Sequence, residues 1–261
     1  MTPNHLTHAL VRPPGASFAR AISSRAASID VGLALAQHAE YCAALAESGL
    51  AVESIAADER YPDGCFMQDP AVVIAGIGVI GRLAAPARRG EEETIAAILT
   101  QRFDTARVNT PGTLEGGDVM VLPDRVLVGR SARSNAAGIA QLAVALATPS
   151  PYNAPGLPVH AIQVAGLLHL LTAATYLGHG ILLAVEHYAE HPAFSGLSVL
   201  VVPPDESYAA NALAVGDRVV LPAGFPGVAA QLRARGFTVL PVPLSEFAKA
   251  DGGVTCLALA W

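Results

Sequence analysis

The chain repeats one unit along its length: two short apolar strands joined by a tight turn and accompanied by a helical stretch. Apolar residues alternate in four such strand pairs, which cover 69–82, 117–129, 172–185 and 210–221. Alternation with a period of two, interrupted by glycine, proline or aspartate, predicts antiparallel hairpins. Helical stretches are expected at 30–48, 91–102, 135–147 and 226–235. The order therefore favours a recurring hairpin-plus-helix unit.

The two ends of the sequence each carry one strand without a neighbouring partner. The segment 253–260 alternates like the others but has no strand downstream, and 7–12 has none upstream. Pairing of these two strands would complete a fifth unit and close the chain into a ring. Ring closure would also remove the exposed edges that an open sheet of such apolar strands could not tolerate. We therefore expect an α/β fold in which five units surround a central cavity.

No shift in composition divides the chain. Hydrophobic residues make up 52% and charged residues 15% of the sequence, which is typical of a well-packed globule. The proline-rich stretch 148–158 is expected to form one long loop. The sequence therefore predicts a single domain over 1–261 with internal fivefold repeats.

Charge and hydropathy narrow the classes of partner. The net charge is −6 and no basic run exceeds Arg88-Arg89, which disfavours nucleic acid and acidic membranes. The mean hydropathy is +0.43, yet glycine, proline or charge interrupts each apolar run before the roughly 18 residues that a helical membrane span needs. A small-molecule ligand fits this composition better. The chain is expected to be a monomer or a homodimer.

The cysteines indicate a reducing compartment. The chain has three cysteines, Cys42, Cys65 and Cys256. Their number is odd, they show no CxxC spacing, and they follow no secretory signal. Reduced thiols in the cytoplasm are the simplest interpretation. Cys42 and Cys65 are expected to pack in the core, and a buried, inert thiol is also the default interpretation of Cys256 from its own segment.

Side chains that can do chemistry fall at comparable points of the repeat. Asp69 opens the first hairpin, Glu115 precedes the second, His169 precedes the third, Asn211 lies in the fourth, and Cys256 opens the last strand. In a closed ring equivalent positions converge on one axis, which would gather a thiol, an imidazole and carboxylates around a cysteine nucleophile. Taken singly, His169 suits a hydrogen-bonded core histidine and Glu115 an ordinary turn acid. Because His169 and Glu115 occupy equivalent positions of the repeat, a purely structural role becomes a weaker explanation for each of them.

The same residues stand in motifs that resemble those of dimethylarginine dimethylaminohydrolases, members of the guanidine-modifying pentein superfamily. The resemblance covers nearly the full length and implies a closed five-bladed α/β-propeller. Each string is weak alone, but their order and spacing together are specific. The matching strings are 62–63 (PD), 69–70 (DP), 85–91 (APARRGE), 113–118 (TLEGGD), 131–135 (SARSN), 168–172 (LHLLT), 207–211 (SYAAN), 222–226 (PAGFP) and 245–256 (SEFAKADGGVTC).

The resemblance implies hydrolysis of arginine that is methylated on a terminal nitrogen, giving citrulline and methylamine or dimethylamine. Cys256 matches the nucleophile that attacks the guanidinium carbon and forms a thiouronium intermediate. His169 matches the general acid and base, and Glu115 matches the carboxylate that favours its protonated form. Because a thiol is mostly protonated at neutral pH, a nearby cation such as the guanidinium itself is expected to draw Cys256 to thiolate.

Substrate contacts are implied by the same resemblance. Asp69 matches the guanidinium-binding aspartate, and the neighbouring position, usually glutamate, is Gln68 here. A guanidinium must meet carboxylate or lose binding energy to desolvation, so the missing charge at Gln68 leaves the preference among arginine and methylated arginines open. The remaining matches are a carboxylate clamp of Arg88 and Arg133, an ammonium site of Asp63 and the main-chain carbonyl of Ala250, and an aliphatic lid residue, Ile22.

Other functions compete with this hypothesis. Arginine deiminase or another guanidine hydrolase would use the same scaffold, and a non-catalytic amino-acid-binding relative would keep the pocket without turnover. A manganese ureohydrolase would need clustered Asp and His ligands, which we do not find, so neither a metal nor another cofactor is expected. The strings GIGVIG at 76–81 and HYAEH at 187–191 resemble dinucleotide and zinc motifs but lack the helices that such motifs require.

Overall fold

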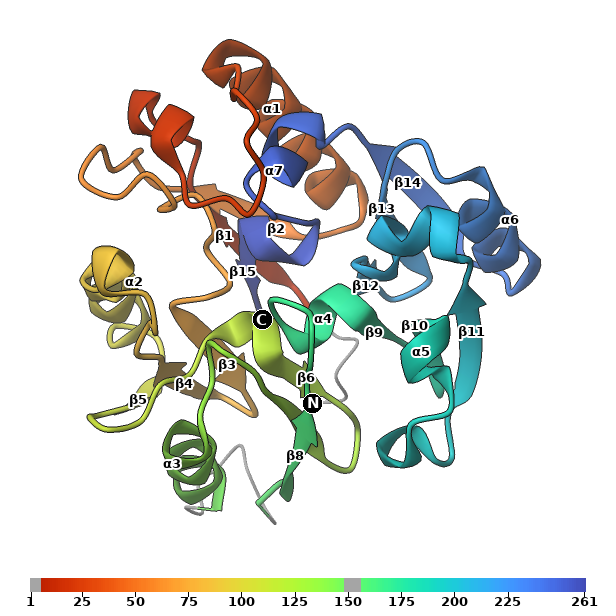
Figure 1. The fold of residues 1–261 in the computed structure, drawn as a ribbon. Helices are drawn as coiled ribbons and strands as arrows, with labels where there is room; N and C mark the ends of the chain where they lie inside the picture. The colour runs from red at the N-terminus through yellow and green to blue at the C-terminus, as the bar shows by residue number, and fades with distance from the viewer. Residues whose placement is uncertain (1–5, 148–155) are drawn as a thin grey trace.

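Five three-stranded sheets surround a common centre (Figure 1). The computed structural model describes residues 6–147 and 156–261, so most of the expected loop at 148–158 lies outside the described residues. Three sheets comprise β15 (Ala258–Ala260), β1 (His8–Val11) and β2 (Ala51–Ser54); β3 (Ala71–Ile74), β4 (Ile77–Ile80) and β5 (Asp104–Arg107); and β6 (Val119–Val121), β7 (Val126–Arg130) and β8 (Val159–Gln163). The other two comprise β9 (Ala174–Gly178), β10 (Ile181–Val185) and β11 (Ser198–Val202); and β12 (Leu213–Val215), β13 (Arg218–Pro222) and β14 (Thr238–Val242). The predicted α/β fold of five repeated units is confirmed.

Tight turns build the hairpins that the sequence predicts. Between β3 and β4 the turn residues Ala75 and Gly76 have φ values of 50° and 78°, and His179 and Gly180 between β9 and β10 have φ values of 51° and 71°. Positive φ at both central residues gives the turn twist that matches two antiparallel strands. These two hairpins are therefore fixed locally, by the chemistry of their own turns.

A third strand in every unit was not predicted. It runs parallel to the middle strand of its sheet, as β5 does beside β4 with Ile77 opposite Asp104. Two of these outer strands, β2 and β5, are largely exposed; β5 reads Asp-Thr-Ala-Arg and buries none of its side chains fully. Because these two strands face water, they lack the apolar alternation by which a strand is recognised in sequence. By contrast, β11 and β14 bury two and three of their five side chains.

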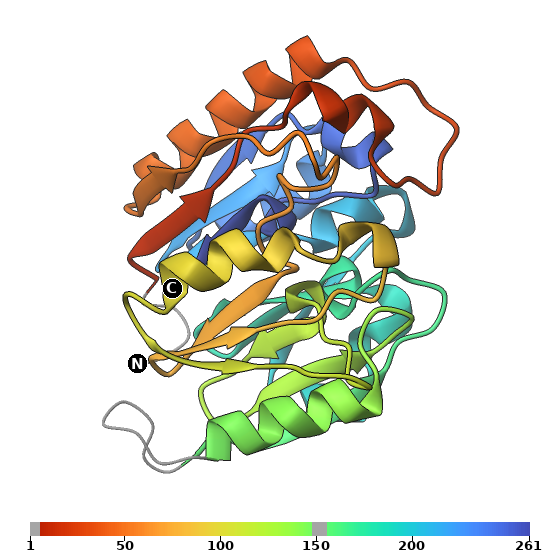
Figure 2. The ribbon, with the colours of Figure 1, turned by 90° about the vertical axis from the view of Figure 1, so that its left-hand side faces the viewer.

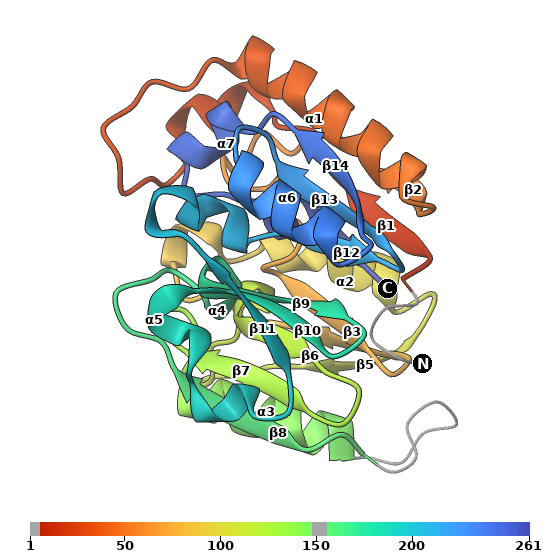
Figure 3. The same cartoon turned by 90° about the vertical axis from the view of Figure 1, so that its right-hand side faces the viewer.

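Long helices lie on the outside of the ring (Figures 2 and 3). They are α1 (Val31–Glu47), α2 (Glu91–Leu99), α3 (Ala136–Ala147) and α6 (Pro226–Ala234), and they confirm the four predicted helical stretches. The Asp30 carboxylate accepts the Leu33 amide and so begins α1, as an N-cap does. Within the described residues, the third unit (β9–β11) has only the four-residue α5 (Glu186–Ala189) and short 3-10 turns on its outside. No helix within the described residues is long and apolar enough to cross a membrane.

The terminal strands complete one sheet, as predicted. β1 and β15 are antiparallel, with Ala9 opposite Ala260 and Val11 opposite Ala258. The ring nevertheless does not remove sheet edges, because the described strands form five separate sheets and each outer strand pairs on one side alone. That part of the sequence argument was wrong: the sheets are held together by side-chain packing between units and not by continuous hydrogen bonding.

The five inner strands β3, β6, β9, β12 and β15 line one cavity of about 590 Å³. Apolar side chains such as Val72, Val119, Leu213 and Leu259 form its wall. Trp261 lies at one end of the strands, whereas α4 (Leu170–Ala173) and α7 (Ser245–Lys249) lie at the other (Figure 3). We call the cavity that the five inner strands line the rear cavity. The turns that precede the inner strands lie at the end of the strands away from Trp261, where α4 and α7 also lie.

Candidate active site

The turns ahead of the five inner strands carry the residues that share a register in the sequence. Asp69 precedes β3, Glu115 caps the 3-10 turn η3 (Gly116–Asp118) ahead of β6, and His169 caps α4 ahead of β9. Asn211 precedes β12. Cys256 lies in the 3-10 turn η6 (Thr255–Leu257) and so precedes β15, whereas the sequence suggested that it opens the strand. The expected convergence of these positions is therefore seen in the structure.

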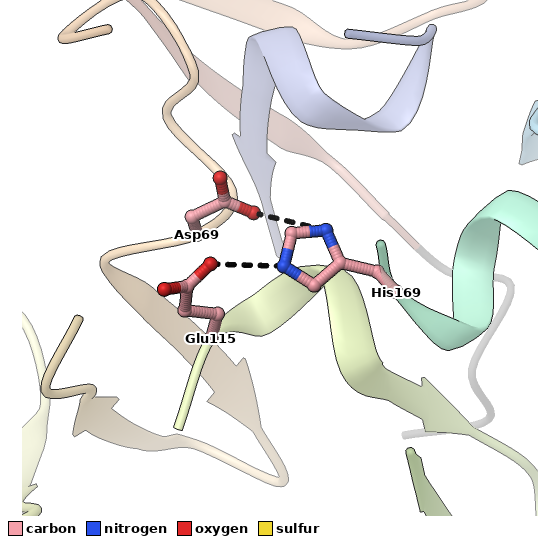
Figure 4. A group of neighbouring side chains, drawn as sticks. All are labelled: Asp69, Glu115 and His169. Carbon is pink, nitrogen blue, oxygen red and sulfur yellow. Dashed lines mark hydrogen bonds and ion pairs between the residues drawn. The ribbon is translucent and has the colours of Figure 1, made fainter. Parts of the chain in front are cut away.

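An imidazole lies between two carboxylates (Figure 4). The His169 Nε2 atom is 2.9 Å from Glu115 Oε2, and Nδ1 is 4.0 Å from Asp69 Oδ1. Burial opposes a charge on His169, but Asp69 and the hydrogen bond with Glu115 outweigh it and raise the pKa of the imidazole. A raised pKa suits a group that must deliver a proton near neutral pH.

The carboxylate of Glu115 is anchored by further contacts. It is fully buried, and its Oε1 accepts the Ala84 amide at 3.0 Å and lies 3.6 Å from Arg133 Nη1. The main-chain amide of Glu115 donates to Ser134 Oγ at 3.0 Å. With one oxygen held in this way, the other is left to orient the ring of His169.

The thiol of Cys256 is half-buried beside the negative charge of Asp69. Burial first, and then the Asp69 carboxylate, raise the pKa of Cys256 to about 12, although the Gly253 amide donates to Sγ at 3.3 Å and acts in the opposite direction. The thiol is therefore protonated at neutral pH. A cation that entered next to Cys256 and Asp69 would offset both effects and lower this pKa.

The two arginines of the expected carboxylate clamp differ in their partners. Arg88 is buried; its Nη1 donates to Asp69 Oδ2 at 2.8 Å, and its Nε and Nη2 donate to the carboxylate of Glu91. Arg133 Nη1, by contrast, is buried without a hydrogen-bond partner in the structure. Arg133 thus offers a free donor, whereas Arg88 is shared between two carboxylates.

Glu91 was missed as a site residue. It begins the helical stretch expected at 91–102 and does lie at the start of α2, but its side chain reaches back to Arg88 across three positions. Burial raises the pKa of Glu91 to about 7 despite the Arg88 charge. The Arg-x-x-Glu spacing is the sequence signal that could have identified this pair.

A small pocket of about 30 Å³ lies among these groups. Of the ten residues expected at the site, all but Glu115 and Gln68 line it. Phe66, Leu168, Asp251 and Gly252 also line the pocket and were not anticipated. Glu115 does not line the pocket but is hydrogen-bonded to Nε2 of His169, which does.

Gln68 and its neighbour Asp69 line different cavities. The main-chain amide of Gln68 donates to the Cys256 carbonyl at 3.1 Å. Asp69 lines the small pocket, whereas Gln68 lines the rear cavity. The expectation that Gln68 contacts substrate is thus not supported by its position.

The segment 21–25 covers the pocket. The Ile22 amide lies 3.2 Å from both carboxylate oxygens of Asp63, and Ser24 donates from its amide and hydroxyl to Asp251 at 2.6 and 2.7 Å. The Ser23 hydroxyl donates to the Lys249 carbonyl. A volume of about 30 Å³ is that of one water molecule, so this segment must move before an amino acid can enter.

Ligand atoms of Asp69, Glu115 and His169 lie within 4.8 Å of one another, which is close enough to hold a metal ion. The neighbouring charges argue against that use. Arg88 donates to Asp69, and Arg133 lies beside Glu115, so each carboxylate already has a cationic neighbour. The cluster is better suited to orienting an imidazole and binding a further guanidinium than to binding a divalent cation.

A half-buried thiol, an oriented imidazole and an acidic guanidinium site inside a five-unit α/β ring define a cysteine-dependent enzyme of the pentein superfamily that acts on guanidine groups. The arginine deiminase family profile matches residues 34–179. The chain belongs to the dimethylarginine dimethylaminohydrolase family. It is 36% identical over 256 residues to the N(G),N(G)-dimethylarginine dimethylaminohydrolase of Pseudomonas aeruginosa, a match that covers 97% of this chain and 98% of that protein. A Streptomyces coelicolor enzyme of the same name is 34% identical over 257 residues.

Solved structures show the same fold. A dimethylarginine dimethylaminohydrolase from P. aeruginosa, in a cysteine-to-serine variant complexed with citrulline, superposes with a TM-score of 0.93 at 33% identity and covers 98% of this chain and 100% of that chain. The N-terminal domain of a cyanobacterial arginine dihydrolase superposes with a TM-score of 0.87 at 21% identity, covering 98% of this chain and 97% of that one. The second likeness concerns the fold alone.

Proposed function

We propose that this protein hydrolyses N-ω-methylated arginine to citrulline and methylamine or dimethylamine through a covalent intermediate on Cys256. The observation that carries the proposal is the placement of Cys256, His169 and Asp69 on one pocket in a chain related over its whole length to enzymes of that name. The chain from 1 to 261 acts as one catalytic domain. Its free cysteines suit the reducing cytoplasm.

Substrate binding supplies the charge that the thiol needs. Asp69 Oδ1 is buried without a hydrogen-bond partner in the structure, so it can accept a guanidinium N–H while Oδ2 stays bound to Arg88. The guanidinium neutralises Asp69 and brings a positive charge beside Cys256, which removes one cause of the raised pKa and adds an opposing one. Binding and activation of the nucleophile are therefore one event.

Two chemical steps follow. The Cys256 thiolate forms a bond to the guanidinium carbon, the bond from that carbon to the methylated nitrogen breaks, and His169 gives its proton to the departing amine. His169 then takes one proton from water as the water adds to the thiouronium carbon. The carbon–sulfur bond breaks, and the second water proton leaves the new carbonyl oxygen for the sulfur, which releases citrulline and the Cys256 thiol. Glu115, hydrogen-bonded to Nε2, favours the imidazolium form in both steps.

The amino-acid end of the substrate has matching groups at the pocket wall. Arg133, with its free Nη1, would bind the carboxylate, assisted by the charge of Arg88. Asp63 and the carbonyl of Ala250 would accept the ammonium. Because Asp63 now receives the Ile22 amide, the ammonium would replace or share that contact when the covering segment closes over the substrate.

Arginine deiminase is the second candidate, and the matching family profile is the observation in its favour. The arginine deiminase of Listeria monocytogenes matches over 52% of this chain and 36% of its own length. The full-length relatives favour the methylated substrate. Gln68 lines the rear cavity, so its lack of charge no longer supports the deiminase alternative.

The test is a citrulline assay with arginine, monomethylarginine and the dimethylarginines, with Cys256→Ser as the control. We expect citrulline from the methylated substrates, an equal amount of amine, and no product with Cys256→Ser. Ammonia release from arginine that exceeded amine release from dimethylarginine would replace the proposal with a deiminase. Ligand binding by Cys256→Ser without turnover of any guanidine by the unaltered protein would indicate a binding protein.

A further inference from the structure

Asn211 lies behind the pocket and is not part of its wall. It is buried, with 6% of its surface exposed, and it follows the 3-10 turn η5 (Pro204–Ala210) in the fourth unit. Its Oδ1 accepts the Thr255 amide at 2.9 Å, and its Nδ2 donates to Thr255 Oγ1 and to the Leu171 carbonyl, both at 2.9 Å. One acceptor bond and two donor bonds engage both ends of this amide.

The partners of Asn211 belong to the two segments that carry the chemistry. Thr255 immediately precedes Cys256, and Leu171 lies two residues beyond His169. The segments come from different units of the ring, and their inner strands β15 and β9 are in different sheets. The Asn211 amide therefore ties the nucleophile turn directly to the start of α4, whose N-terminal neighbour is His169.

The turn beside Cys256 is packed against the same amide. A Cβ atom on Gly253 would lie 2.5 Å from Asn211 Oδ1, so the main chain there approaches the asparagine as closely as glycine allows. Gly253 supplies the amide that donates to Cys256 Sγ, and its carbonyl accepts the Cys256 amide at 3.2 Å. Tyr208 holds the preceding residue by donating to the Gly252 carbonyl at 2.7 Å.

We propose that Asn211 is a positioning residue, which fixes the Cys256 turn relative to the His169 segment and keeps the Gly253 amide directed at the reactive sulfur. Its importance for turnover rests on the proposed function, whereas its effect on the thiol does not. Loss of the amide leaves the Thr255 N–H buried without an acceptor and lets the turn shift. A shift of about 1 Å between reacting groups lowers the rate on the order of a hundredfold.

The experiment compares Asn211→Ala and Asn211→Asp with the unaltered enzyme. We expect kcat to fall about a hundredfold with KM changed less than about threefold, because Asn211 does not line the pocket. Thiolate formation at Cys256 is followed by ultraviolet absorbance during a pH titration with saturating acetamidine, with Cys256→Ser subtracted. In Asn211→Ala the thiolate fraction at a given pH should fall about tenfold, since the sulfur loses a fixed N–H donor. Asn211→Asp keeps an acceptor for the Thr255 amide but loses both donor bonds and adds a negative charge near the turn, so its thiolate fraction should also fall.

Thr255 supplies the matched pair of controls. Thr255→Val removes the hydroxyl that receives the Asn211 Nδ2 bond, and Thr255→Ser keeps it. Thr255→Val should repeat the fall in kcat and in thiolate fraction in part, and Thr255→Ser should lose less than Thr255→Val. If the Asn211 variants do not fold, the two Thr255 variants still test whether Asn211 positions the Cys256 turn.

Two results would overturn the proposal. One is an unaltered thiolate titration in the folded Asn211 variants and in Thr255→Val. The other is a fall in activity that merely follows the fraction of folded protein. If the unaltered protein turned over no guanidine at all, the proposed function would fail, but the thiolate titration would still decide the role of Asn211.

Discussion

At the scale of single residues, Asp69 sets the charge of the whole pocket. Burial raises its pKa, but His169 and Arg88 outweigh burial and keep the carboxylate ionised. That negative charge raises the pKa of both His169 and Cys256. Asp69 thus favours the protonated form of the imidazole, and it keeps the thiol neutral, and so a poorer nucleophile, until a guanidinium binds.

The effect of Asp69→Asn should therefore depend on the ligand. Without an amidine, the variant should form thiolate more readily than the unaltered protein, because an anion beside the sulfur has been removed. With acetamidine, the unaltered protein should gain at least about tenfold in the alkylation rate of Cys256, and Asp69→Asn should gain almost nothing. Mass spectrometry of the peptide that contains Cys256 measures both rates.

Gln68→Ala is the matched control for this prediction. Gln68 adjoins Asp69 in sequence but lines the rear cavity, so its removal should leave the amidine response intact. Equal amidine responses in Asp69→Asn and the unaltered protein would contradict the role of Asp69. A lost response in Gln68→Ala would show that Gln68 takes part in ligand binding after all.

At the scale of elements, the covering segment 21–25 is held at both sides. Its beginning follows the 3-10 turn η1 (Ala16–Arg20), whose first amides donate to the Glu59 carboxylate at 2.8 and 2.7 Å. Its end is bound by Asp251, which has a φ of 58°, the left-handed region that few residues other than glycine and asparagine occupy readily. The structure therefore shows a closed cover held by a small number of partly exposed bonds.

Asp251→Gly should loosen this cover without straining the main chain, because glycine accepts a positive φ. Loss of about 1 kcal/mol of hydrogen bonding should raise KM for methylated arginine about fivefold and speed tryptic cleavage after Arg25 by a similar factor. Asp251→Asn, which keeps a side-chain oxygen and tolerates the same φ, should stay closer to the unaltered enzyme. Unchanged KM and unchanged cleavage in Asp251→Gly would show that these bonds do not hold the segment.

The elements also show what could be predicted from sequence. The hairpins and outer helices were predicted because apolar alternation and turn residues such as Gly76 and Gly180 are local signals. Two of the outer strands, β2 and β5, were missed because they face water and carry no such pattern. Equivalent register placed the site residues together, but it could not show that Gln68 points to the rear cavity or that Glu91 engages Arg88. Those facts depend on side-chain direction and on pairing across turns, which single-sequence patterns do not encode.

At the scale of the whole molecule, the sheet that joins both ends of the sequence supports the nucleophile. Leu10 on β1 is fully buried in a cluster with Met67, Leu99 and Leu259. Packing in this cluster fixes β15 and hence the η6 turn before it. The stability of the ring and the placement of Cys256 thus depend on the same apolar contacts.

Leu10→Ala should lower the free energy of unfolding by about 2–5 kcal/mol, because it opens a cavity in a packed cluster. Leu35→Ala on α1, where 44% of the side chain is exposed, should change it by less than about 0.5 kcal/mol. Urea denaturation followed by circular dichroism measures both values. Similar losses in the two variants would argue against a special contribution of the closing sheet.

The pairing of β1 with β15 also has a consequence for the order in which activity is gained and lost. The contact between Thr7 and Trp261 spans 254 residues, whereas the other hairpins close through turns of a few residues. Closing so long a loop costs more chain entropy and comes late in folding. A molecule in which that one sheet opens would keep four formed units and an intact imidazole–carboxylate pair, yet it would have no placed thiol. The pocket is therefore complete only in molecules in which β1 has paired with β15, because that pairing places Cys256.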